Sequence, residues 1–212
     1  INSGDDVTLT APAGSIDDAT ANPDVVTDIT GDVVTLTALN GVGQTAHLDT
    51  EAVTLDVSVD GTGDIVINEA TGVDLLDIDT FDGSITIDTG GDTIATDVQS
   101  GGDAGGGGDD ISLTLSAGNL EVGTISADVA GTASNVSIVA TTVAGQSVTD
   151  LDDDSMITAD GLSIQVQGGI GTTSDLAINT TVATLTDVDS TVGGDIYLNE
   201  RSEERRVGKE CR

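Results

Sequence analysis

The sequence predicts an all-β protein folded as a right-handed parallel β-helix, a solenoid of stacked short strands. Two observations support this prediction. Segments of alternating apolar and polar residues, rich in Val, Ile and Thr, recur along the chain and are separated by Gly, Asp or Asn. In addition, a pattern that begins at Asn40 and ends at Glu69 returns between Gly168 and Glu200. No segment has a convincing helical period, so we expect strands and turns throughout.

The expected strands are the segments in which the alternation is cleanest: residues 7–11, 34–37, 53–59, 65–67, 85–88, 111–115, 162–166 and 196–198. Turn pairs such as Asn40-Gly41, Asp60-Gly61 and Asp82-Gly83 lie between the apolar stretches. Because the outer face of each coil is in water, we expect Val, Ile and Leu to face the interior and Asp and Thr to face solvent.

The internal repeat is the strongest evidence for a solenoid. Its first copy contains Asn40-Gly-Val-Gly43 and Gly63-Asp-Ile-Val-Ile-Asn-Glu69, and its second contains Gly168-Gly-Ile-Gly171 and Gly194-Asp-Ile-Tyr-Leu-Asn-Glu200. The preceding segments 33–38 and 162–167 also correspond. Compact sandwiches and barrels usually fill a wide interior with large aromatic residues. This chain has only Phe81 and Tyr197, which favours a narrow interior filled by stacked small residues.

Residues 1–200 are expected to form one solenoid segment of a longer repeat protein, with a Gly/Asp-rich loop at residues 101–110. Residues 201–212 match one reading frame of a widely used short-read sequencing adapter, and we interpret them as a non-native tail, of which we expect residues 202–212 to pack on nothing. This tail contains all five basic residues and the one cysteine of the chain. Without its three glutamates, the body keeps 38 − 3 = 35 acidic residues and has no Lys, Arg or Cys.

The negative charge limits the partners of this protein. A body without basic side chains cannot neutralise phosphates, which excludes ordinary binding to nucleic acid. The same charge argues against docking on an anionic membrane surface. Carboxylates at this density repel one another, so we expect high ionic strength or divalent cations to stabilise the fold.

The repeated segments 40–69 and 168–200, together with Gly31-Asp-Val-Val-Thr-Leu-Thr-Ala38 and Asn119-Leu-Glu-Val-Gly-Thr-Ile125, carry a resemblance. They resemble the β-helical shafts of large bacterial exoproteins of the filamentous haemagglutinin type, over most of residues 1–200. The resemblance implies a secreted, rod-shaped segment that is extracellular or lies at the bacterial cell surface, associated with the outer membrane. It implies neighbouring β-helix coils of the full-length protein as partners and supplies no catalytic residues.

Two motifs suggest chemistry that their surroundings do not support. The stretch Gly41-Val-Gly-Gln-Thr-Ala46 has the glycine spacing of a dinucleotide-binding turn, but that turn needs a following helix, and the residues after it are strand-like. Because the same turn occurs in the second repeat copy, it is better explained as a structural turn between strands of the repeat. His47 is the only histidine, and Asp175 occupies its place in the second copy, so we expect His47 in an exposed turn rather than in a catalytic site.

Three acidic segments are candidates for weak calcium binding, because hard cations take several oxygen ligands. The densest clusters are Asp150, Asp152 and Asp154 in one loop and Asp77, Asp79 and Asp82 in another. Neither cluster has the glycine and glutamate positions of an EF-hand loop. Residues 105–113 nearly fit the calcium-binding nonapeptide, with Asp110 at the acidic position, but only one copy is present.

The sequence therefore favours a non-enzymatic shaft segment of an adhesin-like exoprotein, with no cofactor except weakly bound calcium. Two other classes stay open. One is a fragment of a β-helical polysaccharide-degrading enzyme, since paired carboxylates catalyse glycoside hydrolysis. The other is a calcium-dependent, cadherin-like surface module. The body lacks the Lys and Arg residues that hold acidic glycans, and it is poor in the aromatic platforms on which sugars stack.

Overall fold

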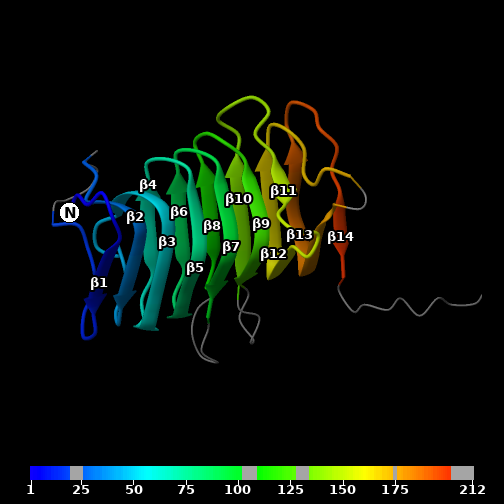
Figure 1. The fold of residues 1–212 in the computed structure, drawn as a ribbon. Helices are drawn as coiled ribbons and strands as arrows, with labels where there is room; N and C mark the ends of the chain where they lie inside the picture. The colour runs from blue at the N-terminus through cyan, green and yellow to red at the C-terminus, as the bar shows by residue number, and fades with distance from the viewer. Residues whose placement is uncertain (20–25, 102–108, 128–133, 174–175, 202–212) are drawn as a thin grey trace, which may run out of the picture.

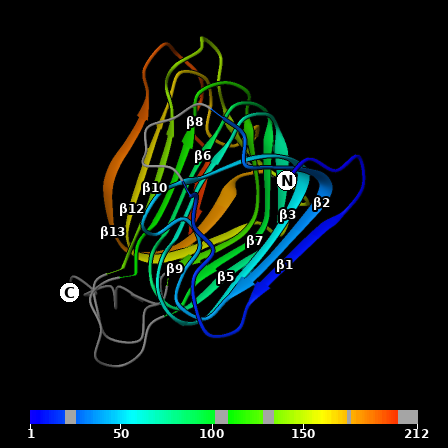
Figure 2. The same ribbon diagram turned by 90° about the vertical axis from the view of Figure 1, so that its left-hand side faces the viewer.

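The fold is a parallel β-solenoid of about eight turns, seen in a computed structural model that describes residues 1–19, 26–101, 109–127, 134–173 and 176–201. Figure 1 shows the strands in a row from β1 to β14, and Figure 2 shows them stacked around a common interior. The described residues form these strands: β1 (Val7–Ala11), β2 (Ile29–Ala38), β3 (Leu48–Thr62), β4 (Ile65–Glu69), β5 (Val73–Asp82), β6 (Ile85–Thr89), β7 (Thr93–Ser100), β8 (Ile111–Leu115), β9 (Leu120–Ala127), β10 (Asn135–Ala140), β11 (Val148–Asp150), β12 (Met156–Val166), β13 (Ile178–Ser190) and β14 (Leu198–Glu200).

Every strand pair is parallel, as expected when each coil stacks on the preceding one. One series runs β2, β3, β5, β7 and β9, and another runs β4, β6, β8, β10 and β12. The long strand β3 belongs to both series, because its start pairs with β4 and the rest pairs with β5. The predicted all-β, parallel β-helical fold is confirmed.

The core consists of columns of aliphatic side chains, one residue from each coil. In one column the backbone register brings together Val34, Leu55, Leu75, Ala95 and Val122. All five are 0% exposed. A second column contains Ile65, Ile85, Ile111, Val136 and Leu162. Stacked side chains of similar size leave a narrow interior that needs no aromatic residue, as the composition predicted.

The alternating segments 7–11, 65–67, 85–88 and 111–115 form strands as predicted, and segments 34–37, 53–59 and 162–166 lie inside longer ones. Two details of the prediction are wrong. Asp60-Gly61 is not a turn but lies within β3, and the last strand begins at Leu198, with Ile196 making only an isolated bridge.

The prediction that Thr and Asp face solvent is only partly correct. Thr50, Thr93 and Thr180 are at most 1% exposed, and the acidic side chains of Asp49 and Glu69 are also buried. These polar residues lie within three residues of a strand end, and Thr50 lies where β3 changes its partner from β4 to β5. Backbone groups need partners at such corners. The buried polar positions therefore belong to the corners of the coils rather than to their flat faces.

Candidate functional site

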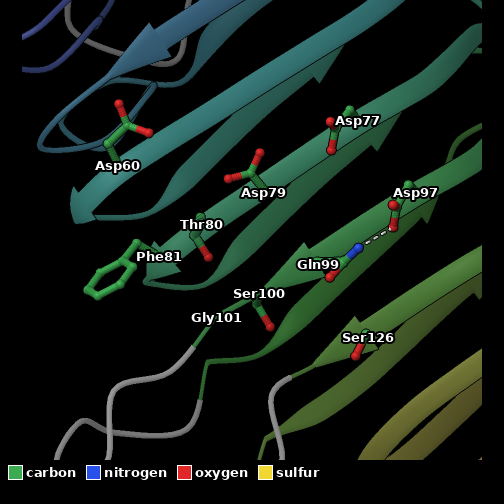
Figure 3. A pocket seen from close by; sticks show the side chains of 10 residues that line it. All are labelled: Asp60, Asp77, Asp79, Thr80, Phe81, Asp97, Gln99, Ser100, Gly101 and Ser126. Carbon is green, nitrogen blue, oxygen red and sulfur yellow. Dashed lines mark hydrogen bonds between the residues drawn. The ribbon is translucent and has the colours of Figure 1, made fainter.

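An acidic groove of about 710 Å³ crosses four neighbouring strands on the surface of the solenoid. Figure 3 shows the side chains that line it, including Asp60 from β3, Asp77 and Asp79 from β5, and Asp97 and Gln99 from β7. Phe81, at the end of β5, lies at one side of the groove and is 63% exposed. The groove therefore combines several carboxylates with an amide and one aromatic ring.

Parallel stacking creates the groove, because it places residues from successive coils in one column, with neighbouring strands about 4.8 Å apart. Asp56 is in register with Asp77. Asp79 lies between Ser58 on one neighbouring strand and Gln99 on the other. The Ser58 hydroxyl donates to Asp79 Oδ2 at 3.1 Å. Gln99 Nε2 donates to Asp97 Oδ1 at 2.8 Å, as the dashed line in Figure 3 marks.

The crowding of carboxylates changes their acidity. Desolvation beside the neighbouring strands raises the pKa of Asp77 above its ordinary value of 3.8, and the charges of Asp97 and Asp56 raise it further. Desolvation also raises the pKa of Asp79, partly opposed by the hydrogen bond from Ser58; the charges of three nearby aspartates add to the increase. The groove thus holds carboxyl groups that retain protons at a higher pH than isolated aspartates do.

The predicted cluster of Asp77, Asp79 and Asp82 is only partly assembled. Asp77 and Asp79 line the groove, whereas Asp82 ends β5 and is not part of the lining. The carboxylates that join them, Asp60 and Asp97, come from other coils, about 20 residues away along the chain. A local reading of the sequence could not find this grouping, because it depends on the register between coils.

The second predicted cluster, Asp150, Asp152 and Asp154, uses its carboxylates to shape its own loop. Asp150 Oδ1 accepts hydrogen bonds from the backbone N–H groups of Asp152 and Asp153, at 3.1 Å and 3.0 Å. Asp152 Oδ1 accepts another from the N–H of Asp154 at 3.3 Å. Across the described residues, no three His, Cys, Asp or Glu side chains are placed so that they could hold a metal ion.

The turn at Gly41–Ala46 leads into strand β3, not into a helix. Its Gly43 has φ +66°, and a Cβ atom there would lie 2.0 Å from the backbone oxygen of Val66 in the next coil. The equivalent Gly171 has φ +69°. These glycines are therefore explained by coil packing. His47 is exposed, as predicted.

The nonapeptide-like segment is only partly described, because residues 102–108 of the Gly/Asp-rich loop lie outside the described ranges. Asp110, at the acidic position of the motif, is hydrogen-bonded to the next coil. Its Oδ1 accepts hydrogen bonds from the backbone N–H and the side-chain Nδ2 of Asn135, at 2.8 Å and 3.0 Å. Residues 202–212 of the predicted tail also lie outside the described part of the chain.

A buried carboxylate corner is the feature that sequence reasoning missed. Glu69 is 1% exposed, and its two oxygens accept hydrogen bonds from Thr50, Ala52 and Thr71. The second repeat copy contains the same corner, with Glu200 accepting from Thr180 and Val182. The repeated Asn-Glu pair in the sequence was the available signal, but it gave no reason to expect a buried acid.

The comparisons with known proteins give no assignment: no family model matches the chain, and neither does any curated protein or any solved structure. Within the described residues, no helix has the length and hydrophobicity needed to cross a membrane.

Proposed function

We propose that residues 1–200 are a non-enzymatic shaft segment of a secreted or cell-surface bacterial exoprotein, similar to adhesins of the filamentous haemagglutinin type. The observation that carries this proposal is the unbroken stack of parallel coils around columns of small aliphatic side chains. About eight turns at about 4.8 Å each give a segment about 38 Å long. Such a stack holds whatever is attached to its two ends at a fixed separation.

The charge of the body limits the partners of the shaft in this proposal. Its 35 acids and absence of Lys and Arg give a surface with no affinity for nucleic acid or for anionic membranes. Its partners in this proposal are neighbouring coils of the same solenoid and a surface receptor bound elsewhere in the exoprotein.

Spin-label distance measurements test the rigid spacer. The variant carries Thr8→Cys on β1 and Asp189→Cys on β13, two exposed positions near opposite ends of the stack, in a Cys211→Ser background. A rigid shaft predicts one narrow distance distribution, because the two labels belong to one hydrogen-bonded stack. A broad distribution in the folded protein would show that the segment bends and cannot act as a rigid spacer.

A polysaccharide hydrolase is the second candidate, and the acidic groove is the observation that favours it. Glycoside hydrolysis uses two carboxyl groups, one of which keeps its proton near neutral pH. Asp77 and Asp79, whose pKa values are raised, line an open groove. Phe81 lies in the same lining and offers a ring on which a sugar can stack.

Assays of the purified chain on pectins, alginates and neutral glycans separate the two candidates. The spacer proposal predicts no turnover. Turnover that is lost in both Asp77→Asn and Asp79→Asn, and kept in Asp152→Asn, would instead establish the groove as a hydrolytic site.

A further inference from the structure

The coil that ends the solenoid repeats the geometry of a coil inside it. In the inner coil, Thr50 Oγ1 donates to Glu69 Oε2 at 2.7 Å; in the terminal coil, Thr180 Oγ1 donates to Glu200 Oε2 at 2.9 Å. The chain also leaves the two corners in the same way. The N–H of Ala70 donates to the backbone carbonyl oxygen of Thr50 at 2.8 Å, and the N–H of Arg201 donates to the backbone carbonyl oxygen of Thr180 at 2.7 Å. The two coils are therefore equivalent up to the residue after the glutamate.

Equivalent core positions differ sharply in exposure. Leu55 of the inner coil is 0% exposed because Leu75 of the following coil covers it. Its counterpart Leu185 stacks on Leu162 from the preceding coil but is 46% exposed. These side chains continue the core columns, so the apolar surface at this end is an uncovered cross-section of the core.

The bridge residues at the same level repeat this contrast. Ile65 bridges Val42, is covered by Ile85 and is 0% exposed. Its counterpart Ile196 bridges Ile170 and is 43% exposed.

The backbone at this end is also uncovered. The inner strand β3 pairs with β2 on one side and with β4 and β5 on the other. Strand β13 pairs with β12 along most of its length, but with β14 only over Ile178–Thr180. The N–H of Val182 donates to Glu200 Oε1, and within the described ranges no strand pairs with the outer edge of residues 183–190. A row of unpaired N–H and C=O groups beside apolar side chains accepts another parallel strand.

We propose that the C-terminal end of the stack, formed by the outer surfaces of β13 and β14, is a docking surface for one further β-solenoid coil with the register of residues 70–89. This segment follows the equivalent corner inside the solenoid, where β5 covers β3 and β6 covers β4. The required coil carries apolar residues at the places of Leu75, Ile78 and Ile87, which are all 0% exposed where they lie. The inference rests on the proposed shaft function in that it names the partner of the shaft's end.

A grafted coil tests the docking surface. A copy of residues 70–89 is inserted between Glu200 and Arg201 of the full chain, with Leu185→Cys as a reporter in a Cys211→Ser background. The expected result is that maleimide labels Leu185→Cys rapidly without the insert and about tenfold or more slowly with it, since a covered thiol reacts only after local opening. Leu55→Cys, at the covered counterpart of Leu185 in the inner coil, provides the reference labelling rate for a buried thiol.

The matched control carries the same insert with Leu75→Asp, Ile78→Asp and Ile87→Asp in the inserted copy, which we expect to leave the labelling rate fast. Hydrogen exchange of amides 183–190, measured without any reporter cysteine, should slow with the apolar insert and not with the Asp insert. Equal labelling and exchange with the two inserts would overturn the proposal. Concentration-dependent protection of the chain without an insert would also overturn it, by assigning the surface to a second copy. Neither outcome alters the distance between labels on β1 and β13, so failure of this inference is distinguishable from failure of the spacer.

Discussion

Thr50 donates its hydroxyl hydrogen to the buried carboxylate of Glu69 at 2.7 Å, and this bond joins two neighbouring coils of the solenoid. Both carboxylate oxygens of Glu69 act as hydrogen-bond acceptors. Oε2 also accepts a hydrogen bond from the N–H of Ala52, and Oε1 accepts hydrogen bonds from the N–H and the hydroxyl of Thr71. Four donors surround one carboxylate that is 1% exposed. A buried acid is stable here because its environment supplies donors in place of water.

Glu69→Gln should destabilise the protein by about 2 kcal/mol or more, because the new amide NH₂ meets donors and leaves buried groups unpaired. Urea denaturation at fixed ionic strength measures the change. Glu200→Gln is the matched control at the equivalent, exposed corner, and we expect a smaller loss there. Equal losses at the two sites would show that burial does not determine the strength of the corner.

Leu75→Ala should cost about 3 kcal/mol or more, the usual range for a large cavity in a packed core. The adjacent Leu76→Ala should cost less than about 1 kcal/mol, because surface changes have small effects. Leu75 is 0% exposed, whereas Leu76 is 43% exposed. The free energy of unfolding of each variant tests this prediction. A larger loss of stability for Leu76→Ala than for Leu75→Ala would contradict the burial of Leu75 in the core.

Gly43→Ala should destabilise the fold by about 2 kcal/mol or more, since backbone strain at a left-handed position adds to the clash. The added Cβ would lie 2.0 Å from the backbone oxygen of Val66. Gly14→Ala is the control, because nothing lies within 4 Å of a Cβ at that position. Melting temperatures of the two variants should separate clearly, and a Gly43→Ala protein as stable as Gly14→Ala would contradict the packing.

Asp77→Asn should stabilise the protein at pH 7 by about 0.5 kcal/mol, the scale of an interaction between exposed charges. The folded-state pKa of Asp77 is raised above 3.8, so the native state binds this proton more tightly than the unfolded chain does. The stability that this group contributes is complete below pH 3.8 and is lost as the pH rises through the raised pKa.

The gain from Asp77→Asn should therefore disappear near pH 4, as measured by denaturation at a series of pH values. Asp32→Asn, which removes an exposed acid of β2 outside the groove lining, is the control for the loss of one negative charge elsewhere on the surface. A gain from Asp77→Asn that is constant with pH would exclude charge repulsion as its cause.

Added salt should raise the melting temperature, because the Debye length falls from about 10 Å at 0.1 M to about 3 Å at 1 M. The comparison uses NaCl and CaCl₂ at equal ionic strength. Screening alone predicts equal increases. A larger increase with calcium that Asp152→Asn abolishes would instead indicate specific binding at the loop of Asp150, Asp152 and Asp154.

The acidic groove was predictable only in part. Asp77 and Asp79 were selected from sequence because they are close together along the chain. Asp60 and Asp97 lie in other coils, and only the register of β3, β5 and β7 brings them to the same groove. The number of residues per coil varies with the length of the loops, so the separation of two carboxylates along the sequence does not determine whether they lie in the same groove.

The sequence by itself determined the class of fold, because β-branched residues in alternation, with few aromatics and a long repeat, are compatible with stacked parallel strands. Strands β5 and β7 were not predicted from the alternation of apolar and polar residues, for a physical reason. Each carries two successive residues that are not buried, Leu76-Asp77 and Thr96-Asp97, and the register shifts at the equivalent place between β3 and β5. Only the tertiary structure decided that Leu75 is buried and Leu76 exposed, that Glu69 is sealed in a corner, and that Leu185 lies uncovered. Each of these depends on the neighbouring coil, and that contact is made between residues distant in sequence.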